Sequence, residues 1–277
     1  MSPENPGAAT ESRAFSTAHG PWDIALVGVL AGLLAGAFGV GGGILVVPGL
    51  VLVTTMSQRL AHGTSLGAVL PIAVASSIGY AAHCNVDLPV AVWLAIGAVS
   101  GAIVGTRLLH VLPARTLGVM FAAVLLLSAV RLFFPTDADG RATLSAATAT
   151  GLVAIGLLTG ILAGLLGIGG GIVIVPTLIL VFGIPPVVAK GTSTLVIVPT
   201  SIMGTWRNQR RDNVDLRAAA VIGGAGVVTA AVGSILADRM SDAVSNILFA
   251  TLLVLVAGWL VVRLGQDHRA ESTMNSS

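Results

Sequence analysis

The sequence predicts an all-α protein that crosses a membrane many times and consists of two similar halves. Of its 277 residues, 55% are hydrophobic and only 9% are charged, and the mean hydropathy is +0.96. A soluble domain carries roughly a quarter charged residues, so this composition is typical of a membrane protein. Uncharged runs that can span the about 30 Å of a bilayer core recur along the chain. They are residues 24–58, 63–82, 88–106, 142–189, 218–237 and 243–262.

One stretch of the chain occurs twice. Residues 32–53 read GLLAGAFGVGGGILVVPGLVLV and residues 160–181 read GILAGLLGIGGGIVIVPTLILV, with identity at 14 of 22 positions. The same offset, which takes position 32 to position 160, continues beyond the glycines, because the Gly-Thr-Ser run at 63–65 recurs at 191–193. The chain is therefore interpreted as one duplicated module, an organisation found in many secondary transporters.

The first module is predicted to open with a broken helix. Residues 22–56 would form a helix about 52 Å long, which is too long for one straight pass. Adjacent glycines each destabilise a helix by ~1 kcal/mol relative to alanine, so the break is expected at the glycine run. The prediction is a helix at 22–38, an irregular turn at 39–43 and a shorter helix at 44–56. Further helices are expected at 63–82, 89–109 and 115–134.

The second module is expected to repeat this plan. Its predicted helices are 147–166, 172–183, 191–206, 217–236 and 243–263, with the glycine turn at 167–171. The predicted organisation is a disordered polar tail at 1–21, repeat 1 at 22–134, a linker at 135–145, repeat 2 at 146–264 and a polar tail at 265–277. The first tail lacks the apolar centre of a cleaved signal peptide, so the first span is expected to act as an uncleaved insertion signal.

The relative orientation of the halves depends on how each glycine-broken opening is counted. One crossing per opening gives about eight spans and parallel halves, whereas two crossings give ten spans and inverted halves. Basic residues favour the second arrangement slightly, because it places ten Arg and Lys on one side and four on the other. The loop at 83–88 has no Arg or Lys, whereas its counterpart at 207–217 has four. We therefore expect inverted halves with both termini in the cytoplasm.

The two glycine turns are the candidate anion site. A helix that starts inside the membrane presents N–H groups without partners and about half a positive charge. Such groups must face a polar cavity or a ligand, and glycine lets a ligand approach the backbone closely. The candidate substrate-binding residues of the turns are Gly41, Gly42, Gly43, Ile44, Gly169, Gly170, Gly171 and Ile172. A second set of glycines at four-residue spacing is assigned to helix packing. This set is Gly28, Gly32, Gly36, Gly156, Gly160 and Gly164.

Four hydroxyl residues accompany the turns as candidate ligands: Thr64, Ser65, Thr192 and Ser193. They lie where the next helices are expected to start, so they could cap those helices or donate to a substrate.

Five further polar residues are accessory candidates: His62, Lys190, Asn85, Asn213 and Arg207. Lys190 could attract an anion, but an ordinary surface loop is the favoured interpretation for this lysine. The asparagines are expected to serve turns and helix caps, and Arg207 to belong to a basic loop that sets topology.

The sequence offers no pattern typical of an enzyme, a cofactor site or a metal site. The glycine run lacks the Gly-Lys-Ser/Thr of a phosphate-binding loop, and the five histidines have no ligand spacing. The basic residues lie in short loops, which is not a nucleic-acid footprint. No acidic residue lies in the middle of a span, which argues against a buried carboxylate relay for H⁺ or Na⁺. The coupling ion, if any, and the oligomeric state stay open.

The paired motifs GVGGGILVVP at 39–48 and GIGGGIVIVP at 167–176, with the two Gly-Thr-Ser runs, resemble the TauE/SafE family of sulfite exporters. The resemblance covers about residues 22–264. It implies passage of sulfite, sulfonates or related organic acids across a bacterial inner membrane. The expected function is a secondary transporter that works by alternating access around the two glycine breaks. A channel-like anion pore and a non-transporting membrane scaffold are the alternatives.

Overall fold

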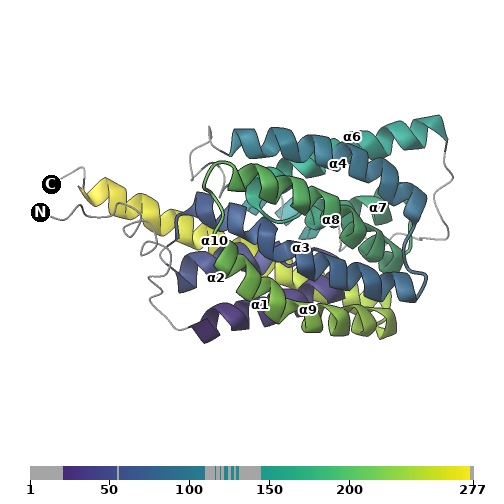
Figure 1. Cartoon of the computed structure of the whole chain (residues 1–277), viewed down its shortest axis with the longest axis horizontal. Helices are drawn as coiled ribbons and strands as arrows, with labels where there is room; N and C mark the ends of the chain where they lie inside the picture. The colour runs from purple at the N-terminus through teal and green to yellow at the C-terminus, as the bar shows by residue number, and fades with distance from the viewer. Residues whose placement is uncertain are drawn as a thin grey trace, which may run out of the picture.

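A computed structural model describes residues 21–54, 56–109 and 145–274, with single positions between 116 and 130. The described residues form a bundle of helices without strands (Figure 1). Most of the expected helix at 115–134, residues 1–20 and 275–277 of the tails, and residues 135–144 of the linker lie outside this part of the chain. The helices of the first half are α1 (Pro21–Phe38), α2 (Gly43–Val53), α3 (Gln58–Ala82) and α4 (Leu88–Leu108). Those of the second half are α6 (Ala146–Leu166), α7 (Gly171–Phe182), α8 (Pro186–Gln209), α9 (Leu216–Arg239) and α10 (Asp242–Met274).

Helices α3 and α8 begin earlier than the sequence predicts. Ser57 caps α3, because its side chain accepts a hydrogen bond from the Leu60 N–H, and Pro186 lies at the first position of α8. The expected starts at 63 and 191 are therefore wrong, since the Gly-Thr-Ser runs lie inside helices. A glycine is tolerated there because another segment of backbone approaches it closely.

Glycine stripes join the two halves. Helix α1 packs along α9, and α4 packs along α6. A Cβ atom on Gly32 would lie 2.2 Å from the carbonyl oxygen of Gly226, and one on Gly160 would lie 2.0 Å from that of Ala98. Only glycine permits such an approach, so the prediction that these stripes serve helix packing is confirmed.

The two long central helices, α3 and α8, run antiparallel. Gly63 near the start of α3 lies against Asn208 near the end of α8, and Gly191 near the start of α8 lies against Tyr80 near the end of α3. The two helices occupy equivalent positions in the repeat, since each carries a Gly-Thr-Ser run near its start. Their opposite directions mean that the halves are inverted, as the charge distribution predicts.

The opening of each half is a hairpin that turns back inside the bundle. In the first half, Gly42 lies against Ala31 and Gly49 against Val27, so α2 returns alongside α1 towards the start of α1. The second half has five described helices, α6 to α10, which is the odd number expected when each glycine-broken opening counts as two passes. The glycine turn therefore reverses the direction of the chain within each half.

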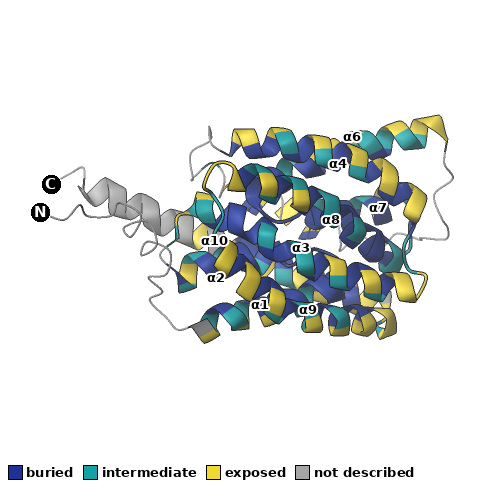
Figure 2. Ribbon diagram, in the orientation of Figure 1, coloured by how far each residue is buried: buried dark blue, intermediate teal, exposed yellow. Residues whose placement is uncertain are grey.

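The apolar surface of the bundle suits a bilayer. Five of the described helices are long and apolar enough to cross a membrane, while α1, α2 and the apolar part of α10 are shorter. Exposed side chains on the outer faces include Leu26, Ile78 and Val228, whereas buried residues concentrate along the central helices (Figure 2). The protein is therefore an integral membrane protein.

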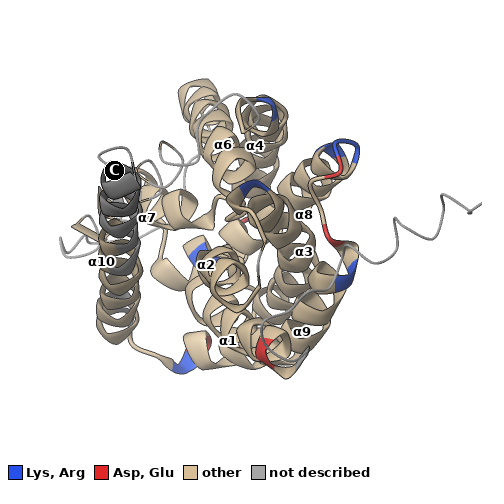
Figure 3. Cartoon of the chain, turned by 90° about the vertical axis from the view of Figure 1, so that its left-hand side faces the viewer, with Lys and Arg blue, Asp and Glu red and all other residues tan. Residues whose placement is uncertain are grey.

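Described arginines gather at one end of the bundle, which we call the arginine end. This is the end where α1, α3 and α9 begin and where α4 and α8 finish (Figure 1). Figure 3 views the molecule from this end and shows basic residues near the ends of α4 and α8. The arginines are Arg59, Arg107, Arg207, Arg210, Arg211 and Arg217, whereas Arg239 lies at the opposite end.

Candidate functional site

The two glycine turns meet at the centre of the bundle. A Cβ atom on Gly43 would lie 2.5 Å from the Cα of Ile168, and one on Gly171 would lie 2.7 Å from the carbonyl oxygen of Gly39. Equivalent turns of the two repeats thus cross over each other in direct contact. The tertiary structure brings the two predicted halves of the site together.

Both turns depend on a left-handed backbone. The φ angles are 77° at Gly41 and 78° at Gly42, and 82° at Gly169 and 90° at Gly170. Side chains larger than hydrogen are strained at such angles. Each turn therefore requires consecutive glycines, whereas a packing stripe would require them only at every fourth position.

The turns expose backbone donors. The carbonyl of Gly42 accepts the first hydrogen bonds of α2, from the N–H groups of Leu45 and Val46, and that of Gly170 accepts the first of α7, from Val173 and Ile174. Over the described residues, no protein acceptor is recorded for the N–H groups of 41–44 or 169–172. Because α2 and α7 both start at the centre and run outwards, the positive ends of two helix dipoles point at one place.

The carbonyl groups beside the turns are already occupied. The hydroxyl of Tyr80 donates to the Gly36 carbonyl at 2.5 Å, and that of Ser193 donates to the Gly39 carbonyl at 2.9 Å. The ring nitrogen Nδ1 of His62 lies 2.6 Å from the Leu166 carbonyl and donates to it. Three carbonyl groups at or beside the ends of α1 and α6 thereby have a side-chain donor.

The two threonines do not cap helices. Thr64 accepts a hydrogen bond from the Asp215 N–H at 2.9 Å, and Thr192 accepts one from the Asp87 N–H at the same distance. Each threonine thus fastens the loop before the fourth helix of the other half. The capping interpretation is wrong because both residues lie within the first two turns of a helix that has already begun.

The two serines of the Gly-Thr-Ser runs differ in their hydrogen bonds. Ser193 donates to the Gly39 carbonyl, and its counterpart Ser65 is fully buried. The Ser65 hydroxyl has no hydrogen-bond partner among the described residues. His62, which lies one helical turn earlier on α3, packs against Gly167 of the second break, so Ser65 belongs to the same neighbourhood.

Lys190 and His62 are not loop residues. Lys190 is 1% exposed and His62 is 4% exposed, and each packs its backbone against the glycine turn of the opposite half. The Lys190 ammonium donates to the Ser245 hydroxyl of α10. The expectation of a surface lysine is wrong because α8 already starts at Pro186 and carries Lys190 inwards.

The remaining accessory candidates lie away from the turns. Asn85 donates to the Asp238 carboxylate at 2.6 Å near the end of the bundle opposite the arginines. Asn213 lies in the loop after α8, and its carbonyl contacts Gly63. The helix caps expected here come from the neighbouring aspartates, Asp87 and Asp215. Arg207 donates to the Thr106 hydroxyl at 3.1 Å at the arginine end.

Two apolar side chains that the sequence did not single out cover the turns. Gly41 and Gly169 both face Val69 of α3 and Ile197 of α8, with Cβ positions 2.9–3.3 Å from their methyl groups. The signal that could have found them is their equivalence in the repeat, because the offset that pairs position 32 with 160 also pairs 69 with 197. They sit midway along the two central helices, so the centre is closed in this conformation.

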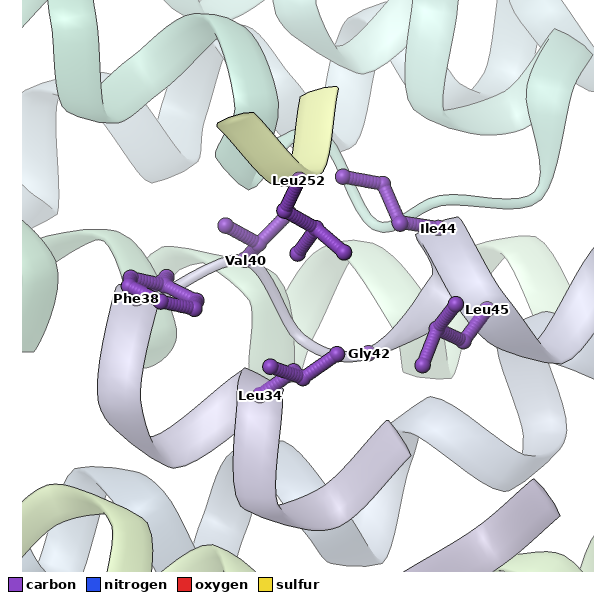
Figure 4. Close-up of a pocket in the computed structure, with 7 residues that line it drawn as sticks. All are labelled: Leu34, Phe38, Val40, Gly42, Ile44, Leu45 and Leu252. Carbon is purple, nitrogen blue, oxygen red and sulfur yellow. The ribbon is translucent and has the colours of Figure 1, made fainter. Parts of the chain in front are cut away.

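A pocket beside the first turn is apolar. Leu34, Phe38, Val40, Ile44 and Leu252 line it together with Gly42 and Leu45 (Figure 4). Phe38 also stacks on Phe249 of α10 at 5.1 Å between ring centroids. This pocket offers no polar side chain to an anion, so it marks where α10 packs and is not the candidate site.

Comparison with known proteins places the chain in a family. The family model described as "Sulfite exporter TauE/SafE" matches twice, over residues 24–154 and 152–276. The probable membrane transporter protein YunE of Bacillus subtilis is 29% identical over 228 residues, which cover 73% of this chain and 83% of that protein. A probable membrane transporter protein of Xylella fastidiosa is 32% identical over 244 residues, which cover 85% and 93% respectively.

A more distant relative is archaeal. The probable membrane transporter protein MJ0441 of Methanocaldococcus jannaschii is 29% identical over 185 residues, which cover 65% of this chain and 68% of that protein. No solved structure matches the chain. Since the family model matches both inverted halves and covers nearly the whole chain, the protein belongs to the TauE/SafE family of membrane transporters.

Proposed function

We propose that the protein is a secondary transporter of small oxyanions, with sulfite, sulfonates and related organic acids as the substrate class. The anion binds between the glycine turns, at the N–H groups of 41–44 and 169–172. Thr64, Ser65 and Thr192 lie around it with hydroxyl groups, and Ser193 positions the first turn through the Gly39 carbonyl. Lys190 adds positive charge at the same depth, and His62 positions the second turn through the Leu166 carbonyl.

The observation that carries this proposal is the convergence of two helix starts on one central point. Two sets of backbone N–H groups without a recorded protein partner favour negative charge there. Tyr80, Ser193 and His62 satisfy the nearby carbonyl groups that would otherwise attract a cation. The charge balance of the site therefore favours an anion.

Alternating access fits the packing better than an open pore. Val69 and Ile197 close the centre, and α3 and α8 form the seam between two packed groups of helices. One group is α1, α2, α3 and α9, and the other is α6, α7, α8 and α4. The fourth helix of each group comes from the other half of the sequence. We therefore take these groups, rather than the sequence halves 22–134 and 146–264, as the moving units.

The arginine end faces the cytoplasm of a bacterial inner membrane in this proposal. Arginine is enriched in cytoplasmic loops, and six described arginines lie at this end against one at the other. Helix α1 begins and α10 finishes at the arginine end (Figure 1), so cytoplasmic termini are part of the same proposal.

Anion binding to Ser65→Ala tests the site. The protein would be reconstituted in nanodiscs and titrated with sulfite, methanesulfonate and acetate by calorimetry, and uptake would be followed in proteoliposomes. Because a hydrogen bond to a charged group contributes about 1.5–3 kcal/mol, the variant should bind its anion about tenfold more weakly or worse. Folding should be unaffected, since the Ser65 hydroxyl has no recorded partner to lose.

Ser100→Ala is the matched control. Ser100 lies on the outer face of α4 and donates to the Ile96 carbonyl, far from the turns along the chain. This variant should bind anions as the wild type does. Wild-type protein that neither binds nor transports any of the three anions would overturn the function, whereas unchanged affinity in Ser65→Ala would overturn the site.

A further inference from the structure

Buried polar atoms without partners are distributed unevenly along the two central helices. Among the described residues, all such side-chain atoms lie on α3 or α8. Those between the centre and the arginine end belong to Gln58, Ser65, Ser201, Thr205 and Asn208, and those towards the opposite end belong to Ser76 and Ser77. A dry interface would bear a penalty for each of these atoms, so the arginine-end half is suited to water or a polar ligand.

The seam between α3 and α8 brings these atoms close to small residues. Thr205 Oγ1 lies 3.9 Å from the Cβ position of Gly67, and Asn208 Cβ lies 3.3 Å from that of Gly63. The two polar side chains of α8 thus face glycines of α3, with the Asn213 carbonyl beside Gly63 and the Ala219 methyl group beside Gly67. The seam is also the boundary between the two packed groups of helices.

Arginines lie at the arginine end of α8, where two of them contact α4. Arg207 Nε donates to the Thr106 hydroxyl at 3.1 Å, and Arg211 donates to the Thr106 carbonyl at 3.4 Å. Thr106 of α4 thus holds two guanidinium groups side by side at the end of α8. Arg210 stacks on Trp206 at 3.9 Å from the ring centroid. Several positive charges held together are attractive to an anion approaching from solution.

The equivalent seam at the opposite end is filled. Tyr80 occupies the position that matches Asn208, is 1% exposed and donates to the Gly36 carbonyl. Gly79 stands where the other half has Arg207. The inverted repeat therefore provides two related seams, of which one contains an aromatic ring and the other contains polar side chains.

We infer that the α3–α8 seam between the glycine turns and the arginine end is an access route for small oxyanions. Arg207 and Arg211 form its mouth, and the hydroxyl groups of Thr205 and Ser201 donate to the anion along its wall. Tyr80 seals the related route at the other end. This inference rests on the proposed function, because it supplies the path to the central site.

Cysteine accessibility tests the route without requiring transport. The single native cysteine, Cys84, is exposed and would first be replaced by serine. Thr205→Cys and Ser201→Cys would then be made in this background, with Ser77→Cys as the matched control, since Ser77 is the counterpart of Thr205. Each variant, in oriented vesicles, would be treated from either side with membrane-impermeant thiol reagents, one bearing a sulfonate and one a quaternary ammonium group. Modification would be read as the mass of the intact protein.

We expect the sulfonate reagent to modify Thr205→Cys and Ser201→Cys from the arginine end, about tenfold faster than the cationic reagent because of the arginine charges. Adding Arg207→Gln should reduce this preference, and methanesulfonate should slow the reaction. Ser77→Cys should stay unmodified from the arginine end. Equal modification of Thr205→Cys and Ser77→Cys, no modification, or a preference for the cationic reagent would overturn the route.

Two further results separate this inference from neighbouring ideas. A charge preference that persists in vesicles with about one third anionic lipid supports free anions at the mouth. A preference that vanishes only in those vesicles means that lipid headgroups cover the arginines, and it would reject Arg207 and Arg211 as the mouth of the route. Modification as expected in a protein that transports nothing would keep the route and reject the proposed function.

Discussion

Replacement of Gly160 by alanine should force α4 and α6 apart. In the present structure the new Cβ atom would lie 2.0 Å from the Ala98 carbonyl oxygen and 2.7 Å from its Cα. Real Cβ atoms essentially never come within 3.0 Å of such atoms, so the helices must separate by about 1 Å. The obstacle is backbone on both sides, and no rotamer change can relieve it.

The expected cost follows from the overpacking of well-packed interiors. Inserting a methyl group without space typically destabilises a protein by about 1–3 kcal/mol. For a chain of 277 residues, such a loss corresponds to a midpoint of thermal unfolding lower by about 2–6 °C. The midpoint would be measured on purified protein in detergent by size-exclusion chromatography after heating.

Gly151→Ala provides the control on the same helix. A Cβ atom there would have only the ring of Phe182 within 4 Å, at 3.9 Å, which is an ordinary contact. Its midpoint should stay within about 2 °C of the wild type, since alanine also favours the helix. Equal midpoints for Gly160→Ala and Gly151→Ala would refute the close approach of α4 and α6.

Two other changes address the loops and the central closure. Thr192→Val removes the acceptor for the Asp87 N–H and should lower the free energy of unfolding by about 1–3 kcal/mol, because a buried donor loses its partner. Denaturant titration would measure this free energy, with Thr251→Val on α10 as the control. An unchanged free energy of unfolding in Thr192→Val would contradict the contact. Val69→Ala combined with Ile197→Ala shortens both side chains over the turns and should raise passive anion leak in proteoliposomes. A leak equal to that of the wild type would show that these side chains do not close the centre.

The glycine turns illustrate which features of the structure can be predicted from the sequence. Uncharged runs, the constant offset between the two copies and the adjacent glycines predict helices, a duplication and two breaks, because hydrophobic length and helix propensity are local properties. Helix propensity also explains why the sequence predicts the starts of α3 and α8 too late, at 63 and 191. Gly63 and Gly191 look like helix breakers in the sequence, but each is a contact point for the carbonyl of an asparagine in the other half.

The burial of Lys190 is a second example. Sequence position suggests a loop at the membrane surface, whereas α8 carries the side chain inwards to Ser245. The role of Tyr80 is similar, since nothing near it in the sequence indicates the Gly36 carbonyl 44 residues earlier. Contacts between distant segments depend on how the helices pack across each other, and a short stretch of sequence does not determine that packing.

The sequence by itself determined that this is a duplicated helical membrane protein with a glycine break in each half, because composition, period and repeat are properties of the chain alone. The tertiary structure decided that the two breaks cross at one centre, that Val69 and Ile197 close it, and that the halves exchange their fourth helices. The physical reason is that a glycine allows any backbone segment to approach closely, whereas the packing of the helices in three dimensions determines which segment contacts it.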